Sequence, residues 1–469
     1  MPRGQNAQTV VIGAGPAGLA AARELALAGR PVTVLEQDQL VGGLSRTVEH
    51  DGFRFDIGGH RFFTKIPEVE RVWDEVMGDD FLVRERLSRI FFRGRLMDYP
   101  LKIGSTLRTL GLKDSLVALG SYLWARIRPL PENSFEGWVG NRFGRRLYQH
   151  FFKTYTEKVW GMPCTEISAD WAAQRIKSLS LWGALRDAIL RRGAAEATSL
   201  LRQFKYPRLG PGMMYEGFRD QVVACGGKVR AGRKAVRLVR ENARIAAVVS
   251  TGAEGEDEHP VGQVISSMPL RELIAAIEPA PPEEVMEAAQ GLRQRGFLTV
   301  ALIIDRPDPF PDQWIYIHEP QVQVGRIQNY RNWSPYMVPD EGMCCIGMEY
   351  FAWPTDPLWS APDAEIIELA TREIHALGLI EGGTVVNGAV VRMADAYPVY
   401  DEGYRERVAT VRRWLDGITN LQTIGRGGQH RYNNMDHSIM TGMLAARNVM
   451  GEQHDIWAVN VEEQYLERR

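Results

Sequence analysis

The segment from Gly425 to Gly442, GRGGQHRYNNMDHSIMTG, gathers side chains that could bind an anionic ligand. Arginine guanidinium groups form charge-assisted hydrogen bonds with phosphates, and a tyrosine hydroxyl can add a further donor. The apolar run that begins near Met435 predicts a helix, and the N-terminal end of a helix carries a partial positive charge. A polar surface loop in front of a capped helix would look the same. On its own, the segment leaves both interpretations open.

A second group of residues, near the N-terminus, has the spacing of a dinucleotide site. The stretch TVVIGAGPAGLAAARELALAG predicts a buried strand, a turn with Gly13, Gly15 and Gly18, and a helix. These glycines would admit a pyrophosphate beside the helix N-terminus, and Glu36, 21 residues after Gly15, would accept hydrogen bonds from ribose hydroxyls. The cofactor contacts expected here are Gly13, Gly15, Pro16, Ala17, Gly18, Glu36 and Gln37.

Length and composition indicate what must position these residues. The 469 residues are 45% hydrophobic, which predicts a large core and about three domain-sized units. A net charge of -2, from 56 Lys+Arg and 58 Asp+Glu, gives no general attraction to nucleic acid. The four cysteines have neither metal-ligand nor disulfide spacing, so we expect no metal site and a reducing, cytoplasmic location.

Two stretches raise the question of a membrane. Residues 4–22 carry no charge, but glycines and a proline interrupt the pattern of a signal peptide. No segment has the roughly 18 continuous apolar residues of a membrane span, so we expect a soluble chain with no integral membrane segment. The stretch from Leu116 to Ile127, LVALGSYLWARI, fits a membrane-surface helix or an amphipathic core helix, and the core helix is the favoured interpretation.

The residues after Glu36, VGGLSRT, resemble the paired-glycine motif of a large flavoprotein family that includes amine oxidases, protoporphyrinogen oxidases, phytoene desaturases and UDP-galactopyranose mutases. The resemblance implies FAD, with its adenine beside the backbone of Val229. The implied pyrophosphate contacts are Gly42, Gly43, Leu44, Ser45 and Arg46. A second GxGxxG after a strand is not visible, so a pyridine nucleotide has no dedicated fold and the flavin needs an external reductant.

Further blocks resemble the UDP-galactopyranose mutases. The stretch FRFDIGGHRFFTKI resembles their flavin-facing loop and implies flavin contacts at Gly58, Gly59 and His60, with His60 helping to shield the flavin. In the blocks TEKVWGMPCTEISADWAAQRI and FPDQWIYIHEPQVQVGRIQNYRNWSPYM, the resemblance implies that Arg175 and Arg326 clamp a diphosphate. The implied substrate contacts are Trp160, Tyr316, Trp333, Tyr397 and Tyr432. The implied flavin contacts of the C-terminal segment are Gly425, Arg426, Asn434, Met435, Asp436 and Ser438.

The chain departs from the mutase pattern where the nucleotide base would bind. Tyr99 matches the tyrosine of that pattern, but Lys102 stands in place of a glutamine and Thr156 in place of an asparagine. A lysine cannot accept a hydrogen bond from the uracil N3–H, although it can donate to a purine carbonyl or a phosphate. The sequence therefore does not specify uridine, and all three residues remain candidates for substrate binding.

The resemblance implies an α/β fold with three parts. A discontinuous, Rossmann-like FAD domain of the GR2 type is expected at 1–52, 205–285 and 395–469. A helical insertion is expected at 103–200, and an antiparallel-sheet substrate domain at 53–102 and 286–394.

The function implied is that of an FAD-dependent nucleotide-sugar isomerase. It would interconvert pyranose and furanose rings in cell-envelope polysaccharide biosynthesis, with N5 of the reduced flavin as the nucleophile. The alternative is an FAD-dependent oxidoreductase of the amine oxidase, protoporphyrinogen oxidase or phytoene desaturase type, because a fold does not fix a function. A flavin-free binding protein on the same scaffold is a third class. The implied partners are a nucleotide-diphosphate sugar and the external reductant, and oligomeric state stays open.

Overall fold

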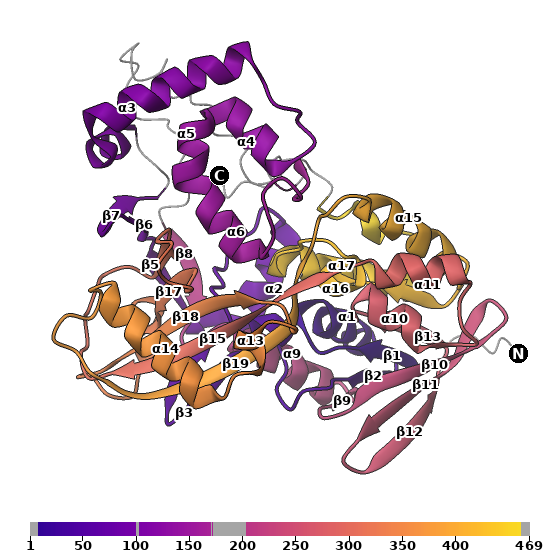
Figure 1. Cartoon of the computed structure of the whole chain (residues 1–469). Helices are drawn as coiled ribbons and strands as arrows, with labels where there is room; N and C mark the ends of the chain where they lie inside the picture. Colours follow the sequence, from indigo (N-terminus) through magenta and orange to yellow (C-terminus); the bar gives the residue numbers. More distant parts are fainter. Residues whose placement is uncertain (1–7, 100–102, 170, 172–202, 461–469) are drawn as a thin grey trace, which may run out of the picture.

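The computed structural model describes residues 8–99, 103–169, 171 and 203–460, and Figure 1 shows how they are arranged. Lys102 and Arg175 therefore lie outside the described residues. A five-stranded parallel sheet and a seven-stranded sheet lie side by side, and the helical insertion stands above the seven-stranded sheet.

The parallel sheet has the order β20-β13-β1-β2-β9. Its central strands are short runs of β-branched and leucine residues that are buried on both faces, as is usual where helices cover a parallel sheet. Because β1 lies in the middle, the turn that follows it opens at the carboxyl edge of the sheet, where ligands bind in such folds. The strands are β1 Thr9–Ile12, β2 Val32–Leu35, β9 Lys228–Arg230, β13 Gln263–Ser266 and β20 Leu421–Thr423.

Helices from both ends of the chain pack on this sheet. The helix α1 (Pro16–Leu27) contacts α9 (Gly212–Ala224) and α17 (Met435–Val449). A Cβ at Gly442 would lie 2.0 Å from the carbonyl oxygen of Ala17, so only glycine allows this crossing. The neighbouring helices are α2 Pro67–Met77, α10 Leu270–Ala276, α11 Glu283–Gln290, α15 Tyr404–Leu415 and α16 Gly425–Gly428.

A four-stranded sheet in the order β12-β11-β10-β14 extends from the parallel sheet, as Figure 1 shows. Its strands are β10 Lys234–Glu241, β11 Arg244–Gly252, β12 Gly255–Pro260 and β14 Ile277–Glu278. Four further strands form two separate two-stranded sheets. They are β3 Thr47–His50 with β4 Phe53–Asp56, and β5 Phe81–Glu85 with β8 Gln203–Pro207.

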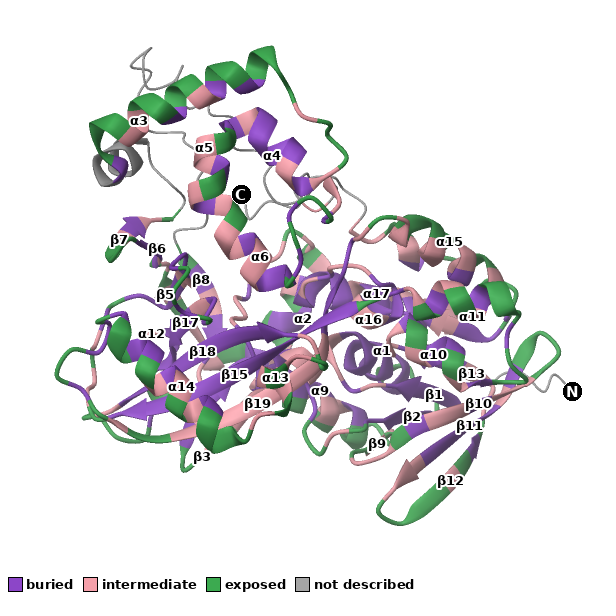
Figure 2. Cartoon of the chain, viewed as in Figure 1, coloured by how far each residue is buried: buried purple, intermediate pink, exposed green. Residues whose placement is uncertain are grey.

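The seven-stranded sheet has the order β19-β15-β18-β17-β16-β6-β7 and is antiparallel except where β16 meets β6. Every residue of β15 and β18 is buried, and Figure 2 shows both strands in the interior. The apolar face of α14 (Asp363–Ala376) covers one side. The strands are β6 Ser88–Phe92, β7 Arg95–Asp98, β15 Gln294–Ile304, β16 Trp314–Ile317, β17 Arg326–Asn329, β18 Cys344–Ala352 and β19 Val385–Pro398. Short helices α12 Tyr330–Trp333 and α13 Pro357–Ser360 lie between them.

The helical insertion consists of α3 Ile103–Ile127, α4 Phe135–Phe143, α5 Arg145–Leu147 and α6 Thr154–Trp160, with a π-helical turn at Tyr148–Lys153. Lys158 fixes it to the seven-stranded sheet, because its Nζ donates to three carbonyl oxygens of the β16–β17 connection at 2.9–3.4 Å. Gly111 has a non-helical backbone and breaks α3 in two. The expectation of a core helix from Leu116 to Ile127 is wrong, because most of its large apolar side chains are exposed.

Among the described residues, no helix has the length and hydropathy needed to cross a membrane. In the same part of the chain, no group of three or more His, Cys, Asp or Glu side chains could hold a metal ion.

Candidate functional site

The first glycine segment forms an open backbone cradle between β1 and α1. Gly13 has a φ of 96°, and a Cβ at Gly18 would lie 1.9 Å from the Gly13 carbonyl oxygen. Gly43 belongs to the second glycine segment, and a Cβ there would lie 3.2 Å from the Cα of Gly15. The two glycine segments therefore meet at the N-terminus of α1, where exposed backbone N–H groups can bind a pyrophosphate. Pro16 and Ala17 form the first turn of that helix.

Glu36 directly follows β2 and lies beside this cradle. Its two carboxylate oxygens accept hydrogen bonds from the backbone N–H of Ala14 at 2.6 Å and of Asp38 at 2.9 Å. Burial raises the pKa of the Glu36 carboxyl, and the backbone hydrogen bonds act in the opposite direction. A carboxylate has about four acceptor positions, so the two bonds leave capacity for ribose hydroxyls. Val229 belongs to the edge strand β9 and pairs with Val34 of β2. Gln37 is exposed.

Arg46 lies at the end of the second glycine segment. Its guanidinium forms an ion pair with Asp38, and Nη2 lies 3.6 Å from the sulfur of Met393. Its Nε is buried and has no hydrogen-bond partner among the described residues. A buried donor of this kind is costly unless an acceptor meets it, so the cradle fits an anionic cofactor group. Leu44 and the buried Ser45 complete the short helical turn before it.

The C-terminal segment closes the other side of the cradle. Gly425 has a φ of 72°, and a Cβ there would lie 2.9 Å from the Cβ of Ala17. Asn434 caps α17, and the buried Met435 and Asp436 begin the helix. Asp436 accepts a hydrogen bond from the hydroxyl of Thr64 at 2.9 Å. The electropositive start of α17 and the buried Ser438 therefore lie against the connection that follows β4.

The connection after β4 carries the expected flavin-facing loop. Gly58 has a φ of 81°, and a Cβ at Gly59 would lie 1.7 Å from the indole of Trp314. His60 Nδ1 donates to the Gly58 carbonyl oxygen at 3.1 Å. Burial, together with the positive charge of Arg426, lowers the pKa of His60 to about 4. His60 is therefore neutral at pH 7.

Two arginines bracket a pair of stacked tyrosines next to this loop. Arg326 Nη1 donates to the Tyr397 hydroxyl at 3.2 Å, and the Tyr397 ring stacks on Tyr432 with centroids 5.7 Å apart. On the other side, the Arg426 guanidinium lies 4.5 Å from the centre of the Tyr432 ring. Burial raises the pKa of Tyr397 to about 12, so its hydroxyl stays a donor at neutral pH. The structure thus brings together four expected residues from β17, β19 and the C-terminal segment.

Of the two arginines, Arg326 forms an ion pair with a carboxylate, whereas Arg426 forms none within the described residues. Arg326 Nη1 lies 3.0 Å from Glu349, whose carboxylate is buried and also accepts from Gln328 at 2.7 Å. Arg326 Nε donates to the Tyr155 hydroxyl, while Nη2 has no hydrogen-bond partner among the described residues. Arg426 donates to two backbone carbonyls and forms no ion pair within the described part of the chain. We call Arg326, Tyr397, Tyr432 and Arg426 the array. Among the described residues, the charge of Arg426 has no carboxylate partner, and Nη2 of Arg326 is a donor without an acceptor.

Aromatic rings extend from Arg326 toward the protein surface. The ring of Tyr155 meets that of Tyr316 edge-on, with the ring centroids 5.7 Å apart. The ring centroids of Tyr316 and Tyr99 are 4.9 Å apart. The guanidinium of Arg86 lies 5.7 Å from the centre of the Tyr99 ring. Such a row can hold a planar base, since aromatic rings and guanidinium groups both stack well. The expected contacts Tyr316 and Tyr99 are thus placed next to each other.

Some expected substrate contacts are placed differently. Trp333 has no exposed surface, packs against Phe204 and Tyr206, and donates its indole N–H to the Gln313 carbonyl oxygen at 2.9 Å. The expectation that Trp333 contacts substrate is therefore not supported, because its side chain has no exposed surface. Trp160 is also buried, and its ring lies edge-on to that of Tyr397 with the ring centroids 6.4 Å apart. Thr156 is buried in α6.

Two residues that bind Arg326 of the array were missed from the sequence, Tyr155 and Glu349. A single acidic residue within the otherwise apolar run CCIGMEYFA is a signal for Glu349, because a buried carboxylate needs a partner. Tyr155 had no comparable signal.

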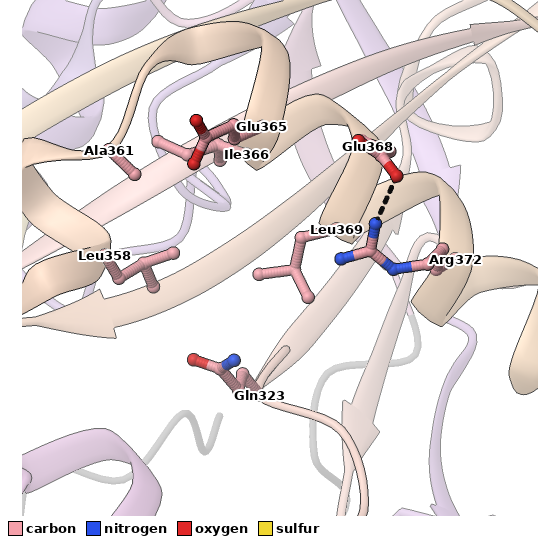
Figure 3. A pocket seen from close by; sticks show the side chains of 8 residues that line it. All are labelled: Gln323, Leu358, Ala361, Glu365, Ile366, Glu368, Leu369 and Arg372. Carbon is pink, nitrogen blue, oxygen red and sulfur yellow. Dashed lines mark hydrogen bonds and ion pairs between the residues drawn. The ribbon is translucent and has the colours of Figure 1, made fainter.

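A surface hollow of about 450 Å³ lies elsewhere, over α14, and Figure 3 shows its lining. Leu358, Ile366 and Leu369 form its apolar wall, and the Glu368–Arg372 ion pair lies at its edge. None of the expected site residues lines this hollow. We therefore assign it no part in the candidate site.

Comparison with known proteins gives matches of two kinds. The sequence profile of a family described as flavin containing amine oxidoreductase matches residues 16–450. Among curated relatives, a putrescine oxidase of Kocuria rosea is 46% identical over 67 residues, which cover 14% of each chain. A 4,4'-diapophytoene desaturase of Staphylococcus haemolyticus is 38% identical over 84 residues, 17% of this chain and 16% of that protein. These alignments thus span less than a fifth of the relatives' lengths.

The solved structures match over nearly the whole chain. A reduced UDP-galactopyranose mutase superposes with a TM-score of 0.83 at 23% identity, covering 97% of this chain and 96% of the other. A putative protoporphyrinogen oxidase of Exiguobacterium gives a TM-score of 0.70 at 16% identity, covering 95% and 99%. At these identities the likeness establishes a shared fold.

Proposed function

Because this chain belongs to the flavin-containing amine oxidoreductase family, we propose that it is an FAD-dependent isomerase that interconverts pyranose and furanose forms of a nucleotide sugar. The family implies FAD, and the expected mixed α/β fold of FAD-dependent amine oxidases is confirmed. The reaction, the reduced working state of the flavin and the nucleotide-sugar substrate are the proposal.

The observation that carries the proposal is the array of Arg326, Tyr397, Tyr432 and Arg426 beside the neutral His60. Arg326 Nη2 and the tyrosine hydroxyls are donors suited to phosphate oxygens, and they come from separate segments that meet at the flavin-facing loop. A row of aromatic rings leads away from Arg326, as a nucleoside attached to the diphosphate requires.

The charge of the array argues against amine oxidation. An amine such as putrescine is a cation at neutral pH, and it would meet Arg426, whose charge no described carboxylate compensates. Like charges in a partly buried site repel by several kcal/mol at short distance, about 4 kcal/mol at 4 Å for an effective dielectric constant of 20. The same charge attracts an anionic ligand, so the site favours binding of an anion over binding of an amine.

The array also fits a polyene poorly. A polyene would have to cover Nη2 of Arg326 with hydrocarbon, which leaves this donor without an acceptor. The sequence relatives nevertheless include desaturases and oxidases, so oxidoreductase chemistry remains the second candidate.

The residues of the array would act on the diphosphate. FAD, when bound and reduced, supplies a nucleophilic N5 for the anomeric carbon of the sugar. Arg326 and the hydroxyls of Tyr397 and Tyr432 would stabilise the charge on the departing diphosphate and hold it for its return. His60, neutral at pH 7, would exclude water without adding charge. The start of α17 would balance the negative charge of reduced flavin. An isomerisation consumes no electrons, so one reduction would serve many turnovers.

The test uses the FAD-loaded protein, reduced with dithionite under anaerobic conditions. It is incubated with UDP-, GDP- and dTDP-hexoses, and pyranose and furanose forms are separated by chromatography. Binding of the free nucleoside diphosphates, measured by calorimetry, gives a second readout that does not depend on turnover. We expect isomerisation of at least one sugar, and loss of diphosphate binding in Arg326→Met with FAD retained.

A different set of results would contradict the isomerase proposal. Absence of diphosphate binding, combined with anaerobic bleaching of the oxidised flavin by an amine or a polyene, would replace the isomerase with an oxidoreductase. A matched variant, Tyr432→Phe, removes one hydroxyl and keeps the stacked ring, so it separates ligand binding from packing.

A further inference from the structure

The part of α3 after Gly111 has two apolar faces, and one of them is exposed. Ala118, Tyr122 and Ala125 are buried against the rest of the insertion. The opposite face carries an apolar stripe of five residues whose relative exposures are 45–79%, and Figure 2 shows this side of α3 as largely exposed. The stripe consists of Leu112, Leu116, Leu119, Leu123 and Ile127.

The spacing of the apolar stripe makes it a continuous surface. Its members follow one another at intervals of three or four residues, which keeps them within about 80° of the helix circumference. Val117 and Trp124, both 48% exposed, widen it on one side. Scattered exposed leucines need no explanation, but a contiguous apolar helix face on a folded domain marks a surface that contacts something else.

Positive charges flank the apolar stripe on both sides. Lys113, Arg126 and Arg128 are exposed, and the Arg128 guanidinium lies 5.1 Å from the centre of the Trp124 ring. The acidic residue of this helix segment, Asp114, is already held by Arg93 and Arg146, each at 3.0 Å. The exposed side of α3 therefore combines apolar and cationic groups without a free carboxylate among its described residues.

This charge pattern decides between two occupants. A second copy of the chain, paired antiparallel through a two-fold axis, would place Lys113 opposite Arg126 and Arg128 of its mate. Cation would then face cation, with no acidic group nearby to compensate. A bilayer that contains anionic phospholipids complements both features, because acyl chains accept the apolar side chains and headgroups attract the cations.

We propose that the apolar stripe of α3 docks this protein peripherally on an anionic phospholipid surface. In Figure 1, α3 lies at the outer edge of the helical insertion, remote from the parallel sheet. The proposal is independent of the reaction catalysed, because it uses none of the residues of the candidate site.

The test measures cosedimentation of the FAD-loaded full chain with vesicles. One set contains phosphatidylcholine alone, and the other contains phosphatidylcholine mixed with phosphatidylglycerol. We expect binding to the mixed vesicles, weakened by added salt, with a blue shift in the emission of Trp124 relative to a Trp124→Phe protein. The double variant Leu116→Gln/Leu123→Gln should lower the affinity at least about ten-fold.

The controls separate docking from general stickiness and from misfolding. Leu27→Gln and Val386→Gln change side chains that are 53% and 52% exposed but lie away from α3, so they should bind vesicles like the unmodified chain. Flavin content and the midpoint of thermal unfolding should stay unchanged in all variants, because every changed side chain is exposed. Lys113→Gln/Arg126→Gln should remove the preference for phosphatidylglycerol.

Two results would overturn the proposal. One is a chain that ignores phosphatidylglycerol vesicles or binds them equally well with the double leucine variant. The other is a concentration-dependent dimer in size-exclusion chromatography that the double leucine variant abolishes, which would show that a second copy covers the stripe.

Discussion

Glu349→Gln should weaken the fold and strengthen ligand binding at the same time. The carboxylate of Glu349 is buried and lies 3.0 Å from Arg326 Nη1, so its removal leaves Arg326 uncompensated. The amide that replaces it fits the same space. Its new N–H can donate to Oε1 of Gln328 once the Gln328 side-chain amide turns over, because Nε2 of Gln328 is the atom that now faces Glu349. The change therefore removes mainly one negative charge.

The expected magnitudes follow from the geometry. Breaking a buried ion pair costs about 3–5 kcal/mol, and Arg326 keeps its bonds to Tyr155 and Tyr397, so we expect a loss near the lower end. An anion on Nη2 would lie about 6 Å from the Glu349 carboxylate, where like charges repel by about 3 kcal/mol at an effective dielectric constant of about 20. Removing that repulsion should tighten nucleoside diphosphate binding by about 10- to 100-fold.

The assay combines thermal unfolding with calorimetric titration of UDP and GDP. We expect a lower unfolding midpoint without ligand and a larger ligand-induced increase than in the unmodified protein, since both report the same coupling. Asp312→Asn is the matched control, because it breaks another buried carboxylate–arginine pair, with Arg89, that is outside the array. If Glu349→Gln retains FAD but binds nucleotide no more tightly, Arg326 does not receive the ligand's charge and the array has been misread.

Three further predictions concern other parts of the molecule. Gly18→Ala would place a Cβ 1.9 Å from the Gly13 carbonyl oxygen, so the purified protein should have lost its flavin absorbance. Burial raises the pKa of Asp56 to about 8, so the folded chain holds a proton that the unfolded chain, with a pKa near 3.9, has released. Stability should therefore fall as pH rises from about 4 to 8, and thermal unfolding across that range should show a flatter slope in Asp56→Asn. Lys158→Met leaves three backbone carbonyls without their donor and should cost about 1–3 kcal/mol in denaturant unfolding, with FAD retained.

The nucleotide-binding part was predictable because its signal is local. Gly13, Gly18 and Glu36 lie within one strand–helix–strand unit, where contacts such as Gly18 against Gly13 and Glu36 with the N–H of Ala14 are local. The array around Arg326 is different, since its members come from β17, β19 and the C-terminal segment. Their residue types and the family resemblance suggested a common site, but only the assembled sheets show that Tyr397 meets both Arg326 and Tyr432.

The errors also have physical causes. The π-helical turn Tyr148–Lys153 precedes α6 and shifts the helical phase by one residue, so the pattern of letters could not show that Tyr155 faces Arg326 while Thr156 is buried. Trp333 belongs to a one-turn helix whose direction local sequence does not specify, and it packs into the core. For Leu116–Ile127, amphipathic spacing indicated a helix correctly but could not tell which of its faces the domain would cover.

The crossing of α17 over α1, which requires glycine at position 442, has a consequence for biosynthesis. On the ribosome, β1, α1 and β2 emerge well before β20 and α17, which complete the sheet and close the cradle. Until α17 has been made, the nascent chain has only half of the cradle, with the alanine-rich face of α1 uncovered. The cradle therefore cannot hold the flavin before α17 emerges, and a chain terminated before α17 should be purified without flavin.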